Sequence, residues 1–171
     1  TCLENCRWGG PASQTNFRGF QIRTNGGHVR IHGCVAIRGA IGLNVDQSEA
    51  LDISNCSFNQ QNSTTSSLPA TDTCGIRLSG AGYKKAFTIR SCYIEACTYG
   101  IIVEKVESLT INDNYIADVG FGSGASSIYL VNGIGSGSDV NNVTIRNNEI
   151  SDQGNTKASI DIGDGANNVV V

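Results

Sequence analysis

The sequence has no methionine, only two prolines and a single tryptophan, and aromatic residues make up 6% of it. Because an initiator methionine is missing, we expect these 171 residues to be one segment of a longer chain. No apolar run approaches the roughly 18 residues that a membrane span needs, and the first residues lack a signal-peptide pattern. The sequence therefore predicts no membrane insertion.

Clusters of positive charge are also absent. Twelve Lys and Arg residues against 15 Asp and Glu residues give a formal net charge of −3, and no basic run occurs. Proteins that bind nucleic acid usually gather Lys and Arg on one face or tail. We expect no nucleic-acid partner.

The cysteine pattern excludes two common kinds of site. The seven cysteines are unevenly spaced, and no C-x-x-C occurs among them. This disfavours a zinc ribbon and a dithiol redox centre, and a chain of this length does not need a disulfide scaffold. We predict free thiols, most of them small buried residues.

What the sequence does contain is a repeated phrase. With 21 glycines and many Ile, Val, Asn and Ser residues, the composition is typical of short strands joined by tight turns. One phrase recurs at 1–8, 29–37, 51–58, 87–94, 109–116 and 143–150, and a seventh copy begins at 169–171. A second phrase lies between the copies, as GFQI (19–22), GLNV (42–45), GIRL (75–78), GIIV (100–103), SIYL (127–130) and SIDI (159–162).

Both phrases alternate apolar and polar residues, which predicts strands rather than helices. A unit of this size cannot bury its apolar face alone, so successive units must stack and form parallel sheets. Stacking predicts two inward columns of side chains. One column is aliphatic (Leu3, Ile31, Ile53, Ile89, Ile111, Ile145), and the other lies at a bend (Cys6, Cys34, Cys56, Cys92, Asn114, Asn148).

These columns resemble the right-handed parallel β-helix of the pectate-lyase-like superfamily, over residues 1–171. The resemblance implies an all-β, right-handed, single-stranded parallel β-helix, a solenoid of about six coils in one domain. Within the superfamily, variable loops with Cys and Asn at the bend are most similar to bacteriophage tailspikes. That likeness implies a homotrimer in a virion tail, acting outside the cell on polysaccharide.

Long polar loops mark one corner of the expected solenoid. Residues 59–74, 118–126 and 131–138 exceed the minimum coil, and such insertions often border a binding face. The first two follow the same bend, so we expect them to flank the coil that carries 87–97.

The candidate site lies between these loops. Tyr93 and Tyr115 should be neighbours on consecutive coils, where flat aromatic faces suit sugar rings. Glu95 and Asp118 lie slightly further along, and a pair of carboxylates can act as acid and as nucleophile or base in glycoside hydrolysis. Asp152 occupies the equivalent place one coil later. The alternative for the tyrosines is an ordinary cross-strand aromatic pair or a contact with another subunit, and the alternative for the carboxylates is a solvated corner position.

Other polar residues extend the candidate site. Arg90, Arg146 and Glu149 could position a glycan, or the arginines could pair with Asp113 or Glu149 across strands. A second acidic group, Asp46, Glu49, Glu104 and Glu107, is interpreted as turn polarity. Asp161 and Asp164 are interpreted as turn residues, not calcium ligands, and we expect no metal and no cofactor.

The histidines complete the candidates. His28 and His32 are the only ones, and neither has a serine or cysteine at nucleophile spacing in the sequence. We predict no catalytic triad and no histidine-rich metal site.

We predict a tailspike-like depolymerase that hydrolyses bacterial surface polysaccharide, capsule or O-antigen, with Glu95 and Asp118 as its catalytic residues. One alternative is a fibre or adhesin module that binds glycan without cleaving it or acts as a spacer. Another is a polysaccharide lyase or epimerase.

Overall fold

The computed structural model describes residues 1–10, 18–24, 27–61, 73–79, 85–120, 125–131, 140–151, 158–164 and 166–171. These residues are strands and short connections, with no helix among them. Accordingly, this part of the chain contains no helix with the length and hydrophobicity to span a membrane. The strands form three sheets, each paired in parallel throughout.

We call the sheets A, B and C in the order in which the chain meets them. Sheet A contains β1 (Cys2–Glu4), β4 (His28–His32), β7 (Ala50–Ser54), β10 (Ala86–Arg90), β13 (Leu109–Asn112), β16 (Val140–Arg146) and β19 (Ala166–Val170). Sheet B contains β2 (Arg7–Gly9), β5 (Val35–Gly39), β8 (Ser57–Gln61), β11 (Tyr93–Glu95), β14 (Tyr115–Ala117) and β17 (Glu149–Ser151). Sheet C contains β3 (Arg18–Arg23), β6 (Ile41–Gln47), β9 (Cys74–Leu78), β12 (Tyr99–Val103), β15 (Ser126–Leu130) and β18 (Ala158–Ile162).

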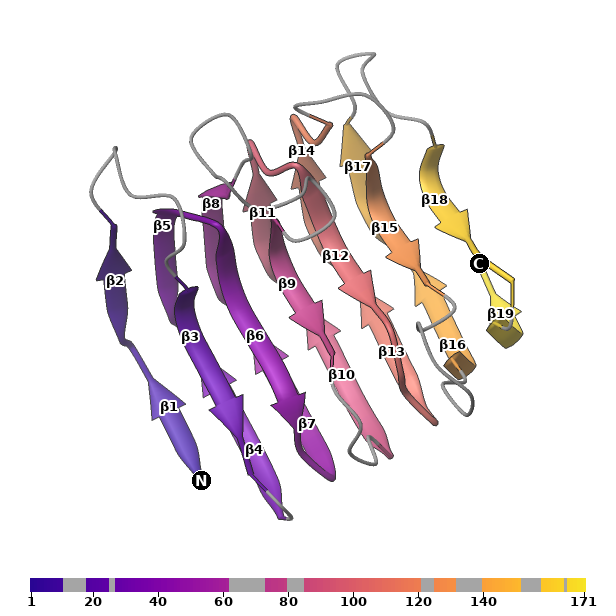
Figure 1. Ribbon diagram of the computed structural model, residues 1–171, viewed down its shortest axis with the longest axis horizontal. Helices are drawn as coiled ribbons and strands as arrows, with labels where there is room; N and C mark the ends of the chain where they lie inside the picture. Colours follow the sequence, from indigo (N-terminus) through magenta and orange to yellow (C-terminus); the bar gives the residue numbers. More distant parts are fainter. Residues whose placement is uncertain are drawn as a thin grey trace.

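One passage through A, B and C is one coil, and each strand pairs with its equivalent in the next coil. The coils follow one another along the long axis, from indigo at the N-terminus to yellow at the C-terminus (Figure 1). This arrangement is consistent with a parallel β-helix, as the repeated phrases predict. The all-β class and the parallel sheets are confirmed.

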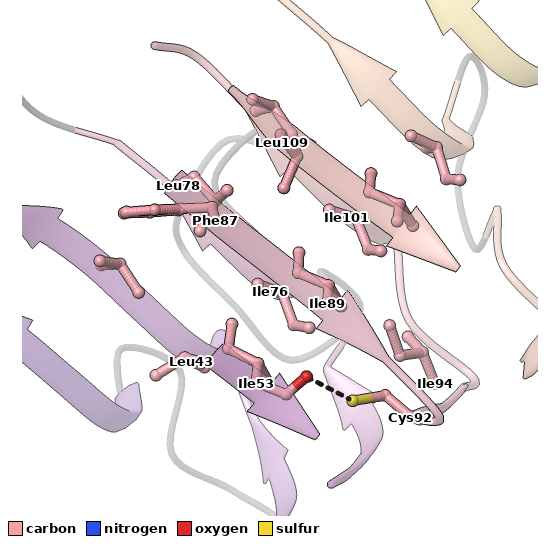
Figure 2. Close-up of a cluster of buried hydrophobic side chains, with 14 of the residues drawn as sticks. Leu43, Ile53, Ile76, Leu78, Phe87, Ile89, Cys92, Ile94, Ile101 and Leu109 are labelled. Atoms are coloured by element: carbon pink, nitrogen blue, oxygen red, sulfur yellow. Dashed lines mark hydrogen bonds between the residues drawn. The ribbon is translucent and has the colours of Figure 1, made fainter. Parts of the chain in front are cut away.

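The aliphatic column lies in register along sheet A. Leu3 opposes Ile31, Ile31 opposes Ile53, and the pairing continues through Ile89 and Ile111 to Ile145. Residues Ile31, Ile53, Ile89 and Ile111 are fully buried. In Figure 2, Ile53 and Ile89 of sheet A lie in one cluster with Leu43, Ile76 and Ile101 of sheet C and Ile94 of sheet B. The core therefore fills the space between the three sheets.

The first corner, between sheets A and B, is made by a residue with left-handed backbone. This position holds Asn5, Gly33, Asn55, Ser91, Asp113 and Asn147, with φ between 52° and 64°. Asn, Asp and Gly tolerate this conformation best, which explains their recurrence there. The chain turns, and the following residue points its side chain inward.

That inward residue forms the predicted column of Cys and Asn. The Sγ atoms of Cys34 and Cys56 contact the carbonyl oxygens of Leu3 and Ile31, one coil earlier, at 3.6 and 3.7 Å. Asn114 Nδ2 donates to the carbonyl of Ile89 at 3.1 Å and to Oδ1 of Asn148 at 2.9 Å. All seven cysteines are free thiols, as expected from the sequence.

Candidate functional site

The best-defined feature of the outer surface is the tyrosine pair on sheet B. Tyr93 of β11 opposes Tyr115 of β14, and the two rings stack with centroids 5.1 Å apart and planes 11° from parallel. Tyr93 is 40% exposed and Tyr115 is half-buried. The predicted adjacency of these residues is confirmed, and the stack presents an aromatic surface with two hydroxyl groups.

Glu95 lies on the same face, two residues after Tyr93. Its Oε2 accepts a hydrogen bond of 2.7 Å from Nδ2 of Asn59, one coil earlier. A hydrogen bond to Glu95 is the largest cause raising the pKa of Tyr93 above its usual value, followed by burial and by the charges of Glu95, Tyr115 and Asp118. Glu95, Tyr115 and Asp118 therefore all lie close enough to Tyr93 to affect its ionisation.

Asp118 lies on a diagonal from Glu95. Ala117 opposes Glu95, and Asp118 follows Ala117 at the corner between sheets B and C, with φ of 50°. The Cα atoms of Glu95 and Asp118 are thus about 6 Å apart, given strands ~4.8 Å apart and a Cα step of ~3.8 Å. Glu95, Ala96, Ala117 and Asp118 form the four corners of a square of Cα atoms. The two positions between the carboxylates therefore carry only methyl side chains.

The other acidic residues predicted to bind glycan are Glu149 and Asp152. Glu149 opposes Tyr115 on β17 and extends the outer column of the tyrosines. Asp152 lies outside the described residues, as do 62–72, 121–124 and 132–138 of the three long loops. The predicted flanking loops therefore stay a prediction.

The two candidate arginines belong to sheet A, whereas the tyrosines belong to sheet B. Arg90 is on sheet A, where its Nε and Nη2 donate to the two carboxylate oxygens of Asp52, both at 3.3 Å. This contact is the main cause raising the pKa of Arg90. Arg30 also approaches Asp52, at 3.8 Å. Cross-strand pairing with Asp113 or Glu149 is therefore wrong for Arg90, because Asp52 lies on the neighbouring strand β7. Arg146 is exposed at the end of β16.

Three residues of the second acidic group, Asp46, Glu49 and Glu104, accept hydrogen bonds within the fold. Asp46 accepts hydrogen bonds from Arg23 Nε at 2.6 Å and Gln21 Nε2 at 2.8 Å. Burial alone would raise the pKa of Asp46, but Arg23, Gln21, Ser79 and Asn44 together lower it to about 2. Glu104 accepts from Arg77 Nε at 3.1 Å, and Glu49 accepts from the Gly27 amide at 3.3 Å. Glu107 is exposed.

His32 has a close serine partner that its spacing along the chain does not show. The sequence places no serine at nucleophile spacing from His32, yet Ser54 Oγ lies 3.1 Å from His32 Nδ1. The partner comes from the next coil, 22 residues away, where spacing along the chain conceals it. Ser54 is only 2% exposed, and this burial is that of a cross-strand contact rather than an accessible nucleophile.

A second aromatic stack was not predicted. Tyr99 and Tyr129 of sheet C stack at 5.6 Å, within a buried cluster that includes Ile41, Cys74 and Ile102. These side chains lie on the outer face of sheet C. The continuous apolar run Tyr99–Val103 was the available signal, since strands covered on both faces lose their alternation.

Within the described part of the chain, no group of three or more His, Cys, Asp or Glu side chains is arranged to hold a metal ion. The chain matches no protein-family model, no curated protein and no solved structure. Function therefore has to be argued from the geometry of sheet B.

Proposed function

We propose that the chain is a segment of a right-handed β-helix of about six coils that binds and hydrolyses bacterial surface polysaccharide, in the manner of a phage tailspike. The observation that supports this most is the exposed Tyr93–Tyr115 stack with Glu95 and Asp118 beside it. Stacked aromatic faces suit the C–H faces of a sugar, and two neighbouring carboxylates suit glycosidic cleavage. In this proposal the protein works as a homotrimer in a virion tail.

The hydrogen bond of Glu95 suggests separate roles for the two carboxylates. Glu95 accepts a hydrogen bond from Asn59, and an ionised carboxylate acts only as an acceptor. Glu95 is therefore assigned as nucleophile or base, and Asp118 as the acid that protonates the leaving oxygen. A carboxyl separation near 5 Å would give retention, and about 6.5 to 9.5 Å would give inversion. The anomeric form of the first product, read by NMR, distinguishes the two outcomes.

The test is release of reducing ends from purified capsule and O-antigen. Glu95→Gln should lower the rate by at least about 100-fold, since acid–base groups contribute 10²–10⁴-fold. Glu107→Gln is the matched control, because it neutralises an exposed carboxylate that lies apart from sheet B. Full activity in Glu95→Gln would remove this site from the proposal.

The second candidate is a module that binds glycan without cleaving it. It is favoured by the tyrosine stack taken alone, because stacking provides affinity and needs no acid. It predicts retention of polysaccharide on the protein, lost in Tyr93→Ala, with no reducing ends in any variant. New unsaturated sugar ends would instead identify a lyase.

A further inference from the structure

Four cysteines stand one above another at the corner between sheets A and B. They are Cys6, Cys34, Cys56 and Cys92, here called the thiol ladder. Backbone hydrogen bonds hold successive rungs in register, from Val35 N to Cys6 O, from Ser57 N to Cys34 O and from Tyr93 N to Cys56 O, at 2.8 to 2.9 Å. The ladder lies inside the solenoid and is separate from the carboxylates on the outer face of sheet B.

The thiols of the ladder make the same contact from coil to coil. The Sγ atoms of Cys34, Cys56 and Cys92 contact the carbonyl oxygens of Leu3, Ile31 and Ile53 in the preceding coil, at 3.6, 3.7 and 4.0 Å. Cys34 is fully buried, and Cys56 and Cys92 are each 2% exposed. Cys6, at the other end of the ladder, is only partly buried. Figure 2 shows Cys92 at the edge of the apolar cluster, with its sulfur directed toward the carbonyl oxygen of Ile53.

The spacing of the ladder matches a simple coordination geometry. Equivalent side chains on neighbouring parallel strands repeat at ~4.8 Å. A soft cation forms bonds of about 2.3 Å to thiolate sulfur, as zinc does, so two such bonds in line span about 4.6 Å. A cation midway between adjacent rungs can therefore bond both sulfurs with little movement of the backbone.

We propose that Cys56 and Cys92 form a two-coordinate site for a thiophilic cation that prefers linear geometry, with Hg²⁺ as the probe. Both S–H bonds break and both protons pass to solvent, the two chloride ligands of HgCl₂ leave as chloride ions, two S–Hg bonds form, and nothing is oxidised or reduced. Two thiolates and one divalent cation make a neutral unit, whereas a monovalent cation would leave a buried negative charge.

The test uses two double variants that each remove two ladder thiols and replace them with asparagine, the residue of the later rungs. C34N/C92N leaves Cys6 and Cys56 without adjacent thiols, and C6N/C34N keeps Cys56 beside Cys92. Cys2, Cys74 and Cys97 remain in both variants, so they contribute equally to the background. Each protein is equilibrated with one equivalent of HgCl₂.

We expect wild type and C6N/C34N to show two sulfur neighbours around mercury by X-ray absorption, release of two protons per ion and a higher thermal midpoint. C34N/C92N should lose all three. Equal signals in the two double variants, or single-sulfur binding in wild type, would overturn the proposal. If C34N/C92N does not fold, C34S/C92S takes its place, and the wild-type sulfur count still decides.

Discussion

Gly75 lies where a strand of sheet C passes closest to the side chains of sheet B. A Cβ atom there would stand 2.8 Å from the carbonyl oxygen of Gly100 and 2.8 Å from Cγ2 of Ile94. Gly42 and Gly100 occupy the same position in neighbouring coils and meet equally close atoms. Glycine opens the first four of the six second phrases, at Gly19, Gly42, Gly75 and Gly100, and at each of them a Cβ atom would meet atoms of a neighbouring strand closer than 3 Å.

We therefore expect Gly75→Ala to lower the free energy of unfolding by about 1–3 kcal/mol, the usual cost of overpacking. Gly9→Ala is the control, because a Cβ there meets nothing within 4 Å. Denaturant unfolding of both variants measures the difference. Equal stability of the two variants would contradict the packing argument.

Asp46 gives a prediction about pH. Its pKa of about 2 lies below the ordinary value of 3.8, so its ionised form stabilises the folded state. This contribution is complete above the unfolded pKa, near 4, and is lost as the pH falls through about 2. Asp46→Asn should thus be less stable than wild type at neutral pH, and the difference should shrink between pH 4 and 2.

The comparison needs a variant that loses the same charge. Glu107→Gln removes one exposed carboxylate from the connection between β12 and β13. Chemical unfolding at several pH values should show a converging difference for Asp46→Asn and almost none for Glu107→Gln. A constant gap between Asp46→Asn and wild type would show that the hydrogen bonds to Asp46 do not depend on its charge.

Individual partners were the hardest features to predict. The alternation of β10 correctly placed Arg90 on the outer face, but it could not show that Asp52, 38 residues earlier, would accept its hydrogen bonds. The contact between His32 and Ser54 was missed for the same reason, because the two residues belong to different coils. In a stacked solenoid the nearest neighbours belong to another coil, and loops of variable length hide them from the linear spacing.

At the scale of single elements, the inward corner residue joins one coil to its neighbours on both sides. Besides its donor contacts, Asn114 accepts through Oδ1 from the Cys92 amide at 3.0 Å. Cys92, at the same place one coil earlier, contacts the Ile53 carbonyl at 4.0 Å. The Cys92 thiol therefore makes the same kind of contact to the preceding coil as the Asn114 amide does, at a longer distance.

Asn114→Ala should destabilise the fold by about 2–4 kcal/mol, because it leaves buried donors and acceptors of the two adjoining coils without partners. Asn114→Cys should cost less, since it extends a column that already contains cysteine. Thermal unfolding compares the two variants. A larger loss for Asn114→Cys than for Asn114→Ala would refute the view that Cys and Asn are interchangeable rungs.

Strand patterns were informative where one face meets solvent. The phrase around β10 and the phrase around β13 alternate, and their register was predictable to the residue. The strand β12 does not alternate, because both of its faces are buried. Its outer apolar cluster, with Tyr99 and Ile102, was therefore missed.

At the scale of the whole molecule, the candidate site exists only because coils stack. Tyr93 and Glu95 come from β11, Tyr115 and Asp118 come from or follow β14, and Asn59 comes from β8. Periodicity predicted this convergence, since parallel pairing aligns equivalent positions. The diagonal placement of Glu95 and Asp118 depends on where the corner between sheets B and C begins. The sequence did not show this position, because Ala96, at the equivalent corner of the preceding coil, is not a residue type that commonly adopts left-handed backbone.

The most direct measurement is a crystal structure of Glu95→Gln bound to an oligosaccharide of a polysaccharide that the wild-type protein retains. Our account predicts a sugar ring against Tyr93 and Tyr115, with a glycosidic oxygen within hydrogen-bond distance of Asp118. A glycan bound across sheet A or sheet C, with the tyrosine stack uncovered, would contradict it.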